Sequence, residues 1–154
     1  MNTIRSSPNR KLMPRILLAG LLAAFAGTAH AQWQVDCFAR VDCAGIVHEA
    51  LDPGILATYP ANRFKMVVFG SNHEFVDGGG AAYAVVGLSE KVRVAGVDLT
   101  VLPLKRYSAS QPWAVATDEV GQTQALANAL RAALDRMNQR CASAPDCPVY
   151  IPYQ

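Results

Sequence analysis

The sequence lacks the features that would place it in several common classes of protein. Of its 154 residues, 17% are charged and 8% are aromatic, and there is no internal repeat, heptad array or low-complexity stretch. Beyond the first 31 residues, no apolar run approaches the roughly 18 residues that a membrane-spanning helix needs. We therefore expect one globular domain with no transmembrane helix.

Motifs typical of catalysis or nucleotide binding are also missing. There is no C-x-x-C pair, which argues against a redox enzyme and against a zinc knuckle. The glycine run after Asp77 has no Lys-Ser/Thr behind it, so it predicts a hairpin loop rather than a phosphate-binding loop. Ser71 and Ser89 do not complete a G-x-S-x-G elbow. We expect no cofactor and no enzymatic activity.

The first 31 residues have the three parts of a secretory signal peptide. A basic segment ends at Arg15, an apolar run extends over residues 16–27, and Ala29 and Ala31 stand where signal peptidase requires small residues. As a helix the apolar run would be about 18 Å long, too short for the roughly 30 Å hydrocarbon core of a membrane. We predict that residues 1–31 are cleaved and that residues 32–154 form a single α+β domain.

Removal of this leader changes the charge of the protein. The leader holds four of the 14 basic residues and no acidic residue, so ten basic residues remain against 12 acidic ones. A slightly anionic domain lacks the electrostatic attraction to phosphate on which nucleic-acid binding depends. We expect a periplasmic or secreted protein without a nucleic-acid partner.

Export also decides how the four cysteines are interpreted. Cys37, Cys43, Cys141 and Cys147 all follow the leader, and an even number of cysteines in an oxidising compartment predicts two disulfides. We favour the local pairing, Cys37 with Cys43 and Cys141 with Cys147, because residues 142–146 are turn-like. The nested pairing, which joins Cys37 to Cys147 and Cys43 to Cys141, stays open because spacing alone does not settle connectivity.

Hydrophobic periodicity predicts the regular elements. The patterned segments are residues 43–51 (helix, capped by Asp42), 63–75, 81–88, 91–94 and 97–101 (strands) and 118–140 (helix). The remaining segments are residues 53–62, expected to be irregular, 108–112, expected to be a linker, and 148–152, expected to be a final edge strand. The result is an α+β fold of two layers: an antiparallel sheet of three to four strands packed by a long C-terminal helix, with a short N-terminal helix.

The long helix has the strongest pattern in the chain. Its apolar residues recur every three or four positions and define one stripe: Leu126, Leu130, Ala133, Leu134 and Met137. Acidic residues stand at its start and basic residues at its end, as the helix dipole favours. We expect this stripe to cover the sheet.

The two histidines that remain after cleavage both lie in an H-E-x-x-D pattern. These copies supply His48 and Asp52, and His73 and Asp77. Imidazole and carboxylate ligands suit zinc, so these four residues are the candidates for a metal site. The first copy lies on a predicted helix and the second on a predicted strand, so the two do not present equivalent ligands. We favour a polar helix face and a polar hairpin end over a metal site.

Candidates for partner binding are a set of basic residues and one tryptophan. Lys91, Arg93, Lys105 and Arg106 are expected to gather on one exposed sheet face, either as a solvated face or as a patch for an acidic partner. Trp33 is suited both to a core and to an interface, and the sequence does not separate the two.

Three classes of function agree with these observations. The first, which we favour, is a small exported protein that binds another envelope protein, as an inhibitor or immunity-type partner does. The second is a metal-dependent hydrolase built from the two H-E-x-x-D segments. The third is a structural accessory of an envelope assembly that acts by strand addition at a sheet edge.

Overall fold

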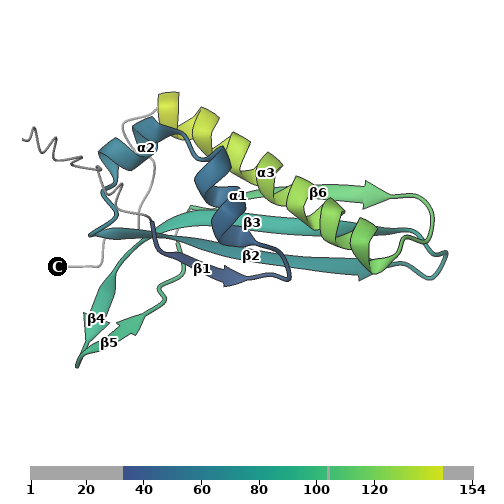
Figure 1. The fold of residues 1–154 in the computed structure, drawn as a ribbon, viewed down its shortest axis with the longest axis horizontal. Helices are drawn as coiled ribbons and strands as arrows, with labels where there is room; N and C mark the ends of the chain where they lie inside the picture. The colour runs from purple at the N-terminus through teal and green to yellow at the C-terminus, as the bar shows by residue number, and fades with distance from the viewer. Residues whose placement is uncertain (1–32, 104, 144–154) are drawn as a thin grey trace, which may run out of the picture.

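The structure is a computed structural model that describes residues 33–103 and 105–143, without the side chains of Ala142 and Ser143. The predicted leader, Cys147 and the predicted strand over residues 148–152 lie outside the described residues. The elements in chain order are β1 (Val35–Phe38), α1 (Cys43–Ala50), α2 (Pro53–Thr58), β2 (Phe64–Glu74), β3 (Gly80–Glu90), β4 (Val92–Val94), β5 (Val97–Leu99), β6 (Tyr107–Trp113) and α3 (Glu119–Ser143). Figure 1 shows them in space.

Four strands form the main sheet in the order β1-β2-β3-β6. β2 pairs antiparallel with β3, and β3 with β6, but β1 runs parallel to β2. The sheet is therefore mixed. The sequence analysis predicted an antiparallel sheet, and that prediction is wrong for β1. The reason is that α1 and α2 form a crossover between β1 and β2, which brings the chain back in the same direction. The α+β class with a long C-terminal helix is confirmed.

The β2–β3 hairpin is the longest pairing in the sheet. It extends from Phe64 opposite Glu90 to Glu74 opposite Gly80. Its turn is closed by the Phe75 amide, which donates to the Gly79 carbonyl at 2.7 Å. The hairpin predicted from the glycine run is thus confirmed.

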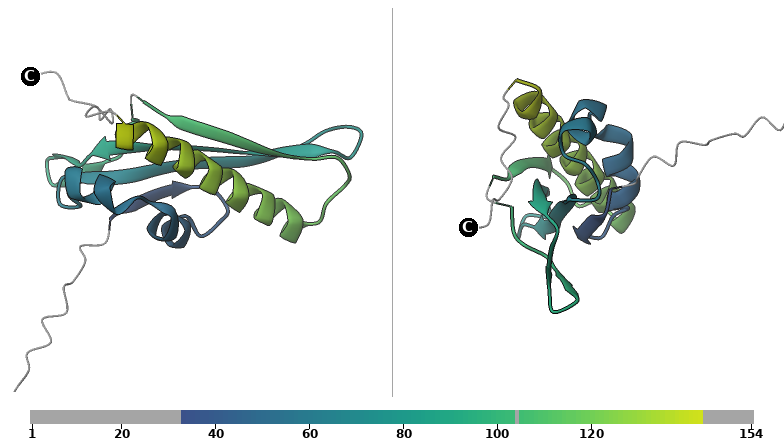
Figure 2. Two further views of the ribbon diagram at one scale, coloured as in Figure 1. Left: turned by 90° about the horizontal axis from the view of Figure 1, so that it is seen from above. Right: turned by 90° about the vertical axis from the view of Figure 1, so that its left-hand side faces the viewer.

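The core lies between the sheet and α3, and the predicted helix stripe is buried there. All five predicted stripe residues are at most 2% exposed. They face the inner side of the hairpin, where Met66 and Val68 of β2 lie opposite Leu88 and Val86 of β3. α3 contacts β3 and β6 most extensively, and α1 packs against it from the side. Figure 2 shows all three helices on one side of the sheet.

Three elements, β1, α2 and β6, are absent from the sequence prediction. The segment expected to be irregular contains α2, which begins with Asp52 as N-cap and Pro53 in the first turn, a favourable helix start. The expected linker over residues 108–112 is part of β6. Ser, Gln and Pro do not favour strands, but β3 offers a free edge, and Ala109 is buried against the core.

β4 and β5 form a hairpin of their own rather than part of the main sheet. Ala95 and Gly96 make its turn with φ of 49° and 83°, the left-handed conformations of a two-residue hairpin turn. Nearly all residues of both strands are exposed. The alternation of these strands does not bury one of their faces, because the hairpin projects away from the main sheet on the side opposite the helices (Figure 2).

Candidate binding site

The H-E-x-x-D residues do not form a site in the part of the chain that the structure describes. Asp52 accepts the Gly54 amide at 2.6 Å as the N-cap of α2, and Asp77 accepts the Gly79 amide at 3.1 Å in the hairpin turn. His48 lies on α1 and His73 near the end of β2. No three His, Cys, Asp or Glu residues within residues 33–103 and 105–143 lie close enough to hold a metal ion.

One contact of His73 was not foreseen from the sequence. Its Nε2 lies 3.0 Å from Ser71 Oγ, and both residues are exposed. The two are neighbours on one face of β2 because they are two positions apart on a strand. Among the described residues, no carboxylate bonds to the other ring nitrogen, so the pair lacks the third group that orients the base in a catalytic triad.

The basic candidates are exposed but do not share one sheet face. Arg93 lies on β4, where it forms an exposed ion pair with Asp98 at 2.8 Å. The hydrogen bond from Arg93 lowers the pKa of the Asp98 carboxyl below its usual value. Lys105 and Arg106 precede β6, which belongs to the main sheet, and Lys91 lies between β3 and β4. Only Arg93 lies on a strand, so the four do not lie on one sheet face as expected.

Trp33 belongs to the core. Its side chain is 3% exposed and lies in the cluster between sheet and helices. It cannot anchor a partner on the surface of this structure, so the core role is the correct one.

A disulfide joins Cys37 at the end of β1 to Cys43 at the start of α1, with the two Cα atoms 5.9 Å apart. This is the local pairing for the first two cysteines and excludes the nested one. Cys141 lies in the last turn of α3 and is not free, whereas Cys147 lies outside the described residues. A disulfide of this kind is typical of an extracytoplasmic protein.

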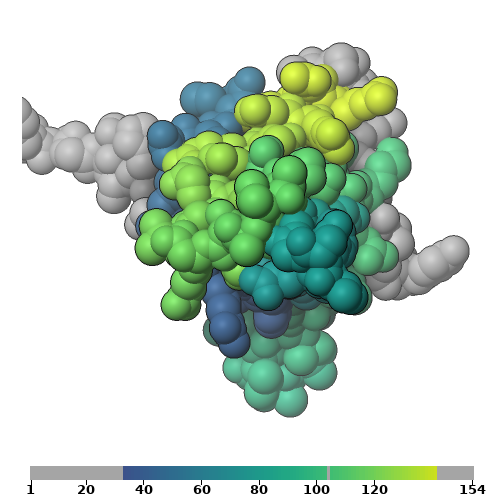
Figure 3. All heavy atoms as spheres, turned by 90° about the vertical axis from the view of Figure 1, so that its right-hand side faces the viewer, coloured from purple at the N-terminus to yellow at the C-terminus, as the bar shows by residue number. Residues whose placement is uncertain are grey.

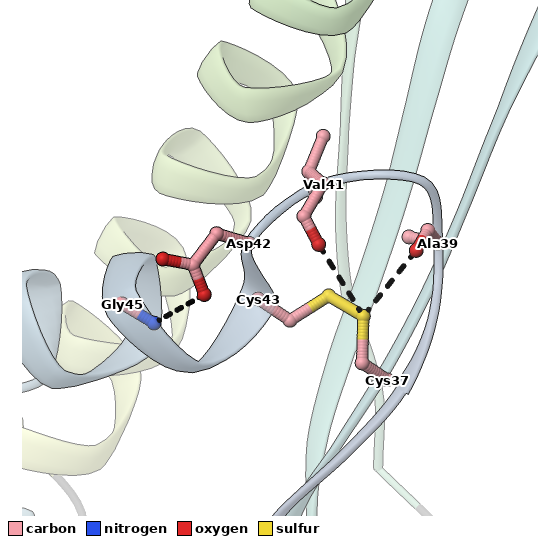
Figure 4. Close-up of a disulfide and its surroundings, with 6 residues drawn as sticks. All are labelled: Cys37, Ala39, Val41, Asp42, Cys43 and Gly45. Carbon is pink, nitrogen blue, oxygen red and sulfur yellow. Dashed lines mark hydrogen bonds between the residues drawn. A yellow bond between two sulfur atoms is a disulfide. The ribbon is translucent and has the colours of Figure 1, made fainter.

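We call residues 37–43 the disulfide loop, because its backbone wraps around the sulfur atoms. Cys37 Sγ lies 3.4 Å from the Ala39 carbonyl oxygen and 3.8 Å from the Val41 carbonyl oxygen (Figure 4). Asp42 closes the loop by accepting the Gly45 amide at 2.9 Å, which caps α1. The loop is thus closed by the disulfide and capped where α1 begins.

A polar cleft opens on the helix side of the sheet next to this loop. It has a volume of about 350 Å³ and is lined by Arg40, Gly70, Ser71, Asn72, Gln122 and Leu126. Gly70 lets the loop approach: a Cβ there would lie 3.0 Å from Ala39 Cβ and 2.9 Å from a methyl carbon of Leu126. The cleft depends on a glycine at this position of β2.

A second, more open groove lies on the other side of the loop. Its volume is about 510 Å³, and its lining comes from the loop, α1 and the first turns of α3: Val41, Asp42, Ile46, Glu119, Val120, Thr123, Gln124 and Ala127. Figure 3 views the molecule from the end at which α3 begins beside the β2–β3 turn. The groove is apolar, and its two charged residues are both acidic.

The outer side of the sheet carries exposed aromatic residues. Phe38 lies opposite Phe69, and Phe69 opposite Val85, so the three share one face with Tyr83, two positions from Val85. The rings of Phe38 and Phe69 stack with centroids 4.9 Å apart. Phe38 is 51% exposed and Tyr83 is 45% exposed. We call these four residues the open face.

The other half of the same side is covered by residues 99–103. Lys65, which is 2% exposed, donates to the Leu99 carbonyl at 3.0 Å and forms an ion pair with Asp36 at 2.6 Å. Pro103 is buried directly over Gly87, where a Cβ would lie 2.5 Å from the proline ring. We call this region the covered half.

Asp36 is held as an anion by this arrangement. Burial raises the pKa of its carboxyl, but the hydrogen bonds from Lys65, Thr100 and Gln34 and the positive charge of Lys65 together lower it by more, so that the pKa lies below the ordinary value of 3.8. Thr100 Oγ1 donates to Asp36 at 2.6 Å. The ion pair therefore joins β1, β2 and the covering segment.

Comparisons with known proteins leave the family open. No protein family and no curated protein matches the chain. Among solved structures, a candidate lipoprotein from Caulobacter crescentus matches 75% of this chain and 87% of its own chain, with 14% sequence identity and a TM-score of 0.34. A TM-score this low supports no argument. Function therefore has to be inferred from the residues of this chain.

The sequence did not reveal the residues that line the cleft or form the open face. Arg40, Asn72 and Phe38 stand in no motif, and they come together only because β1 pairs with β2. The one available signal was the spacing of Cys37 and Cys43, whose disulfide closes a short loop that contains Phe38 and Arg40.

In the described part of the chain, no helix is both long enough and apolar enough to cross a membrane.

Proposed function

We propose that this chain is an exported protein that binds another protein of the cell envelope, and that it binds through the open face. The disulfide between Cys37 and Cys43 and the predicted leader both support a location outside the cytoplasm. We also propose that it acts by binding rather than by catalysis.

The observation that carries this proposal is the stacked pair of Phe38 and Phe69 beside Tyr83, on a sheet face that no described residue covers. Aromatic residues dominate the binding energy of protein interfaces because each removes a large apolar area from water. Exposed groups of apolar residues on soluble proteins are typical of interaction sites. Two of these three rings are about half exposed.

The covered half indicates what the open face accepts. There, an extended segment with a buried proline crosses the outer side of the sheet and gives a backbone carbonyl to Lys65. The open face continues the same surface on the same strands, β2 and β3. We therefore propose that the partner supplies an extended, apolar segment of protein chain.

Site-specific crosslinking tests this proposal. A photoreactive phenylalanine replaces Tyr83 on the open face or, as a control, Val97 on the β4–β5 hairpin, which is 61% exposed. In envelope preparations we expect one crosslinked partner from position 83 and none from position 97. Phe38→Ala and Tyr83→Ala together should weaken binding of that purified partner about 30-fold or more, the effect of losing a central aromatic anchor.

Three results would contradict the proposal. Equal crosslinking from both positions would show that the contact is nonspecific. Unchanged affinity in the double variant would place the partner elsewhere. A crosslinked product made of two copies of this chain, together with a dimer in analytical ultracentrifugation that the double variant loses, would make the open face a self-association surface.

A hydrolase is the second candidate, favoured only by the 3.0 Å contact between Ser71 and His73. A hydrolase would turn over an ester or peptide substrate, and His73→Ala would abolish that activity. Our proposal predicts that the purified protein shows no turnover and that His73→Ala leaves partner binding unchanged.

A further inference from the structure

We propose that the polar cleft binds the C-terminal end of a short peptide, and that Arg40 holds its carboxylate. The cleft opens on the helix side of the sheet, whereas the open face lies on the outer side. Its volume of about 350 Å³ falls within the range of small-molecule sites. The proposal does not depend on the proposed function, because the two sites share no residue.

Arg40 provides the cationic end of the cleft. Its side chain is exposed and, among the described residues, forms no hydrogen bond or ion pair. Its backbone lies between Ala39 and Val41, whose carbonyl oxygens contact Cys37 Sγ. A guanidinium on an ordered backbone binds a carboxylate through two parallel hydrogen bonds, which favours a carboxylate ligand.

Asn72 provides a hydrogen-bond acceptor beside the cation. Its Nδ2 donates to the Gln122 carbonyl at 3.3 Å, which fixes the orientation of the amide. Its Oδ1 is buried and has no partner in the described part of the chain. A buried acceptor without a donor is costly, so an N–H or O–H from a ligand that reaches this oxygen would be stabilised there. The amide N–H next to a peptide's terminal carboxylate is such a donor.

Gln122 fixes the opposite wall of the cleft. Its Nε2 donates to the Thr117 carbonyl at 3.2 Å and to Glu74, and its backbone carbonyl accepts from Asn72. Arg40 is the one charged residue among the described residues that line the cleft. A cation beside an unpaired acceptor matches a carboxylate with a neighbouring amide N–H, whereas an inorganic anion such as sulfate has no donor for that acceptor.

Calorimetry on the exported protein tests the proposal with three probes. Dialanine has both termini free, dialanine amide lacks the carboxylate, and acetyl-dialanine lacks the ammonium group. We expect dialanine to bind and the amide to bind about tenfold more weakly or worse, because it loses a charged bidentate partner. Acetyl-dialanine keeps the carboxylate and should bind about as well as dialanine.

A variant assigns the cation to a residue. Arg40→Gln should weaken dialanine about tenfold but leave the affinity of dialanine amide unchanged. Arg106→Gln, at an exposed arginine outside the cleft, is the matched control and should change nothing. Circular dichroism confirms that each variant is folded.

The proposal is overturned by any of three results. The first is the absence of dialanine binding up to about 10 mM, which is about ten times the Kd of a weak site near 1 mM. The second is equal affinity for dialanine and its amide. The third is a loss of affinity in Arg106→Gln as large as that in Arg40→Gln. Loss of partner binding through the open face would not bear on it.

Discussion

On the outer side of the four-stranded sheet, residues 99–103 cover one half, and no described residue covers the other. The two halves lie on the same strands, β2 and β3, yet they differ in chemistry. The covered half has a buried lysine, a carboxylate and a glycine, each matched to the segment above it. The open face has aromatic and aliphatic side chains that are matched to nothing in the described chain. The comparison shows that a polar sheet face can be buried when the cover is part of the chain, whereas the described residues leave an apolar face of the same sheet exposed.

The largest expected effect comes from breaking the ion pair of the covered half. Asp36→Ala leaves Lys65 buried without its partner and should lower the free energy of unfolding by about 3–5 kcal/mol. Lys65→Met together with Asp36→Ala should recover most of this loss, because the buried charge is then gone. Urea denaturation followed by circular dichroism measures both; a loss below about 1 kcal/mol in the single variant would mean that the pair is not buried in solution.

Adding a side chain at Gly87, which lies directly under Pro103, should have the next largest effect. Gly87→Ala places a methyl group 2.5 Å from the proline ring and 2.8 Å from the Lys105 carbonyl oxygen, so overpacking should cost about 1–3 kcal/mol. Tyr83→Ala on the open face should change stability by less than about 0.5 kcal/mol. Equal losses in the two variants would remove the distinction between the halves.

Lowering the pH should reduce the free energy of unfolding by less than these substitutions do, because protonated Asp36 still forms hydrogen bonds. Its pKa in the folded state lies below the unfolded value of 3.8, so its contribution is complete above that value and is lost as the pH falls through the folded pKa. Urea midpoints measured from pH 6 down to about pH 2.5 should therefore decline less in Asp36→Asn than in the natural protein. Parallel declines would contradict this assignment.

The smallest effect is expected outside both halves, on the β4–β5 hairpin. Arg93 and Asp98 form an ion pair that is fully exposed to solvent, and such pairs contribute little because water and salt screen them. Asp98→Asn should leave the thermal midpoint unchanged within experimental error at physiological salt. A clear drop would show that the hairpin is docked more firmly than its exposure indicates.

Local patterns in the sequence account for the elements that were predicted correctly. α1 and α3 each have a capping or periodic signal within their own residues, and the β2–β3 hairpin has a glycine-rich turn. β1 and β6 have no such signal: one is four residues long, and the other contains Ser, Gln and Pro. Both exist because β2 and β3 offer free edges, a tertiary effect that propensity does not report.

The site was less predictable than the fold, for the same reason. Arg40 lines the cleft only because β1 lies parallel to β2 and Gly70 admits the loop. Asn72 stands out only through an unpaired oxygen, which no sequence pattern records. The residues that the sequence did single out, such as Asp52 and Asp77, bond to neighbouring backbone amides instead.

The bond between Cys37 and Cys43 also has a mechanical meaning. β1 is a four-residue strand at the margin of the sheet, the kind of segment that peels away easily and pairs with a neighbouring molecule. The end of β1 is covalently bonded to the first turn of α1, so β1 cannot separate from the sheet without displacing a packed helix. The disulfide therefore opposes the exchange of β1 with another copy of the chain.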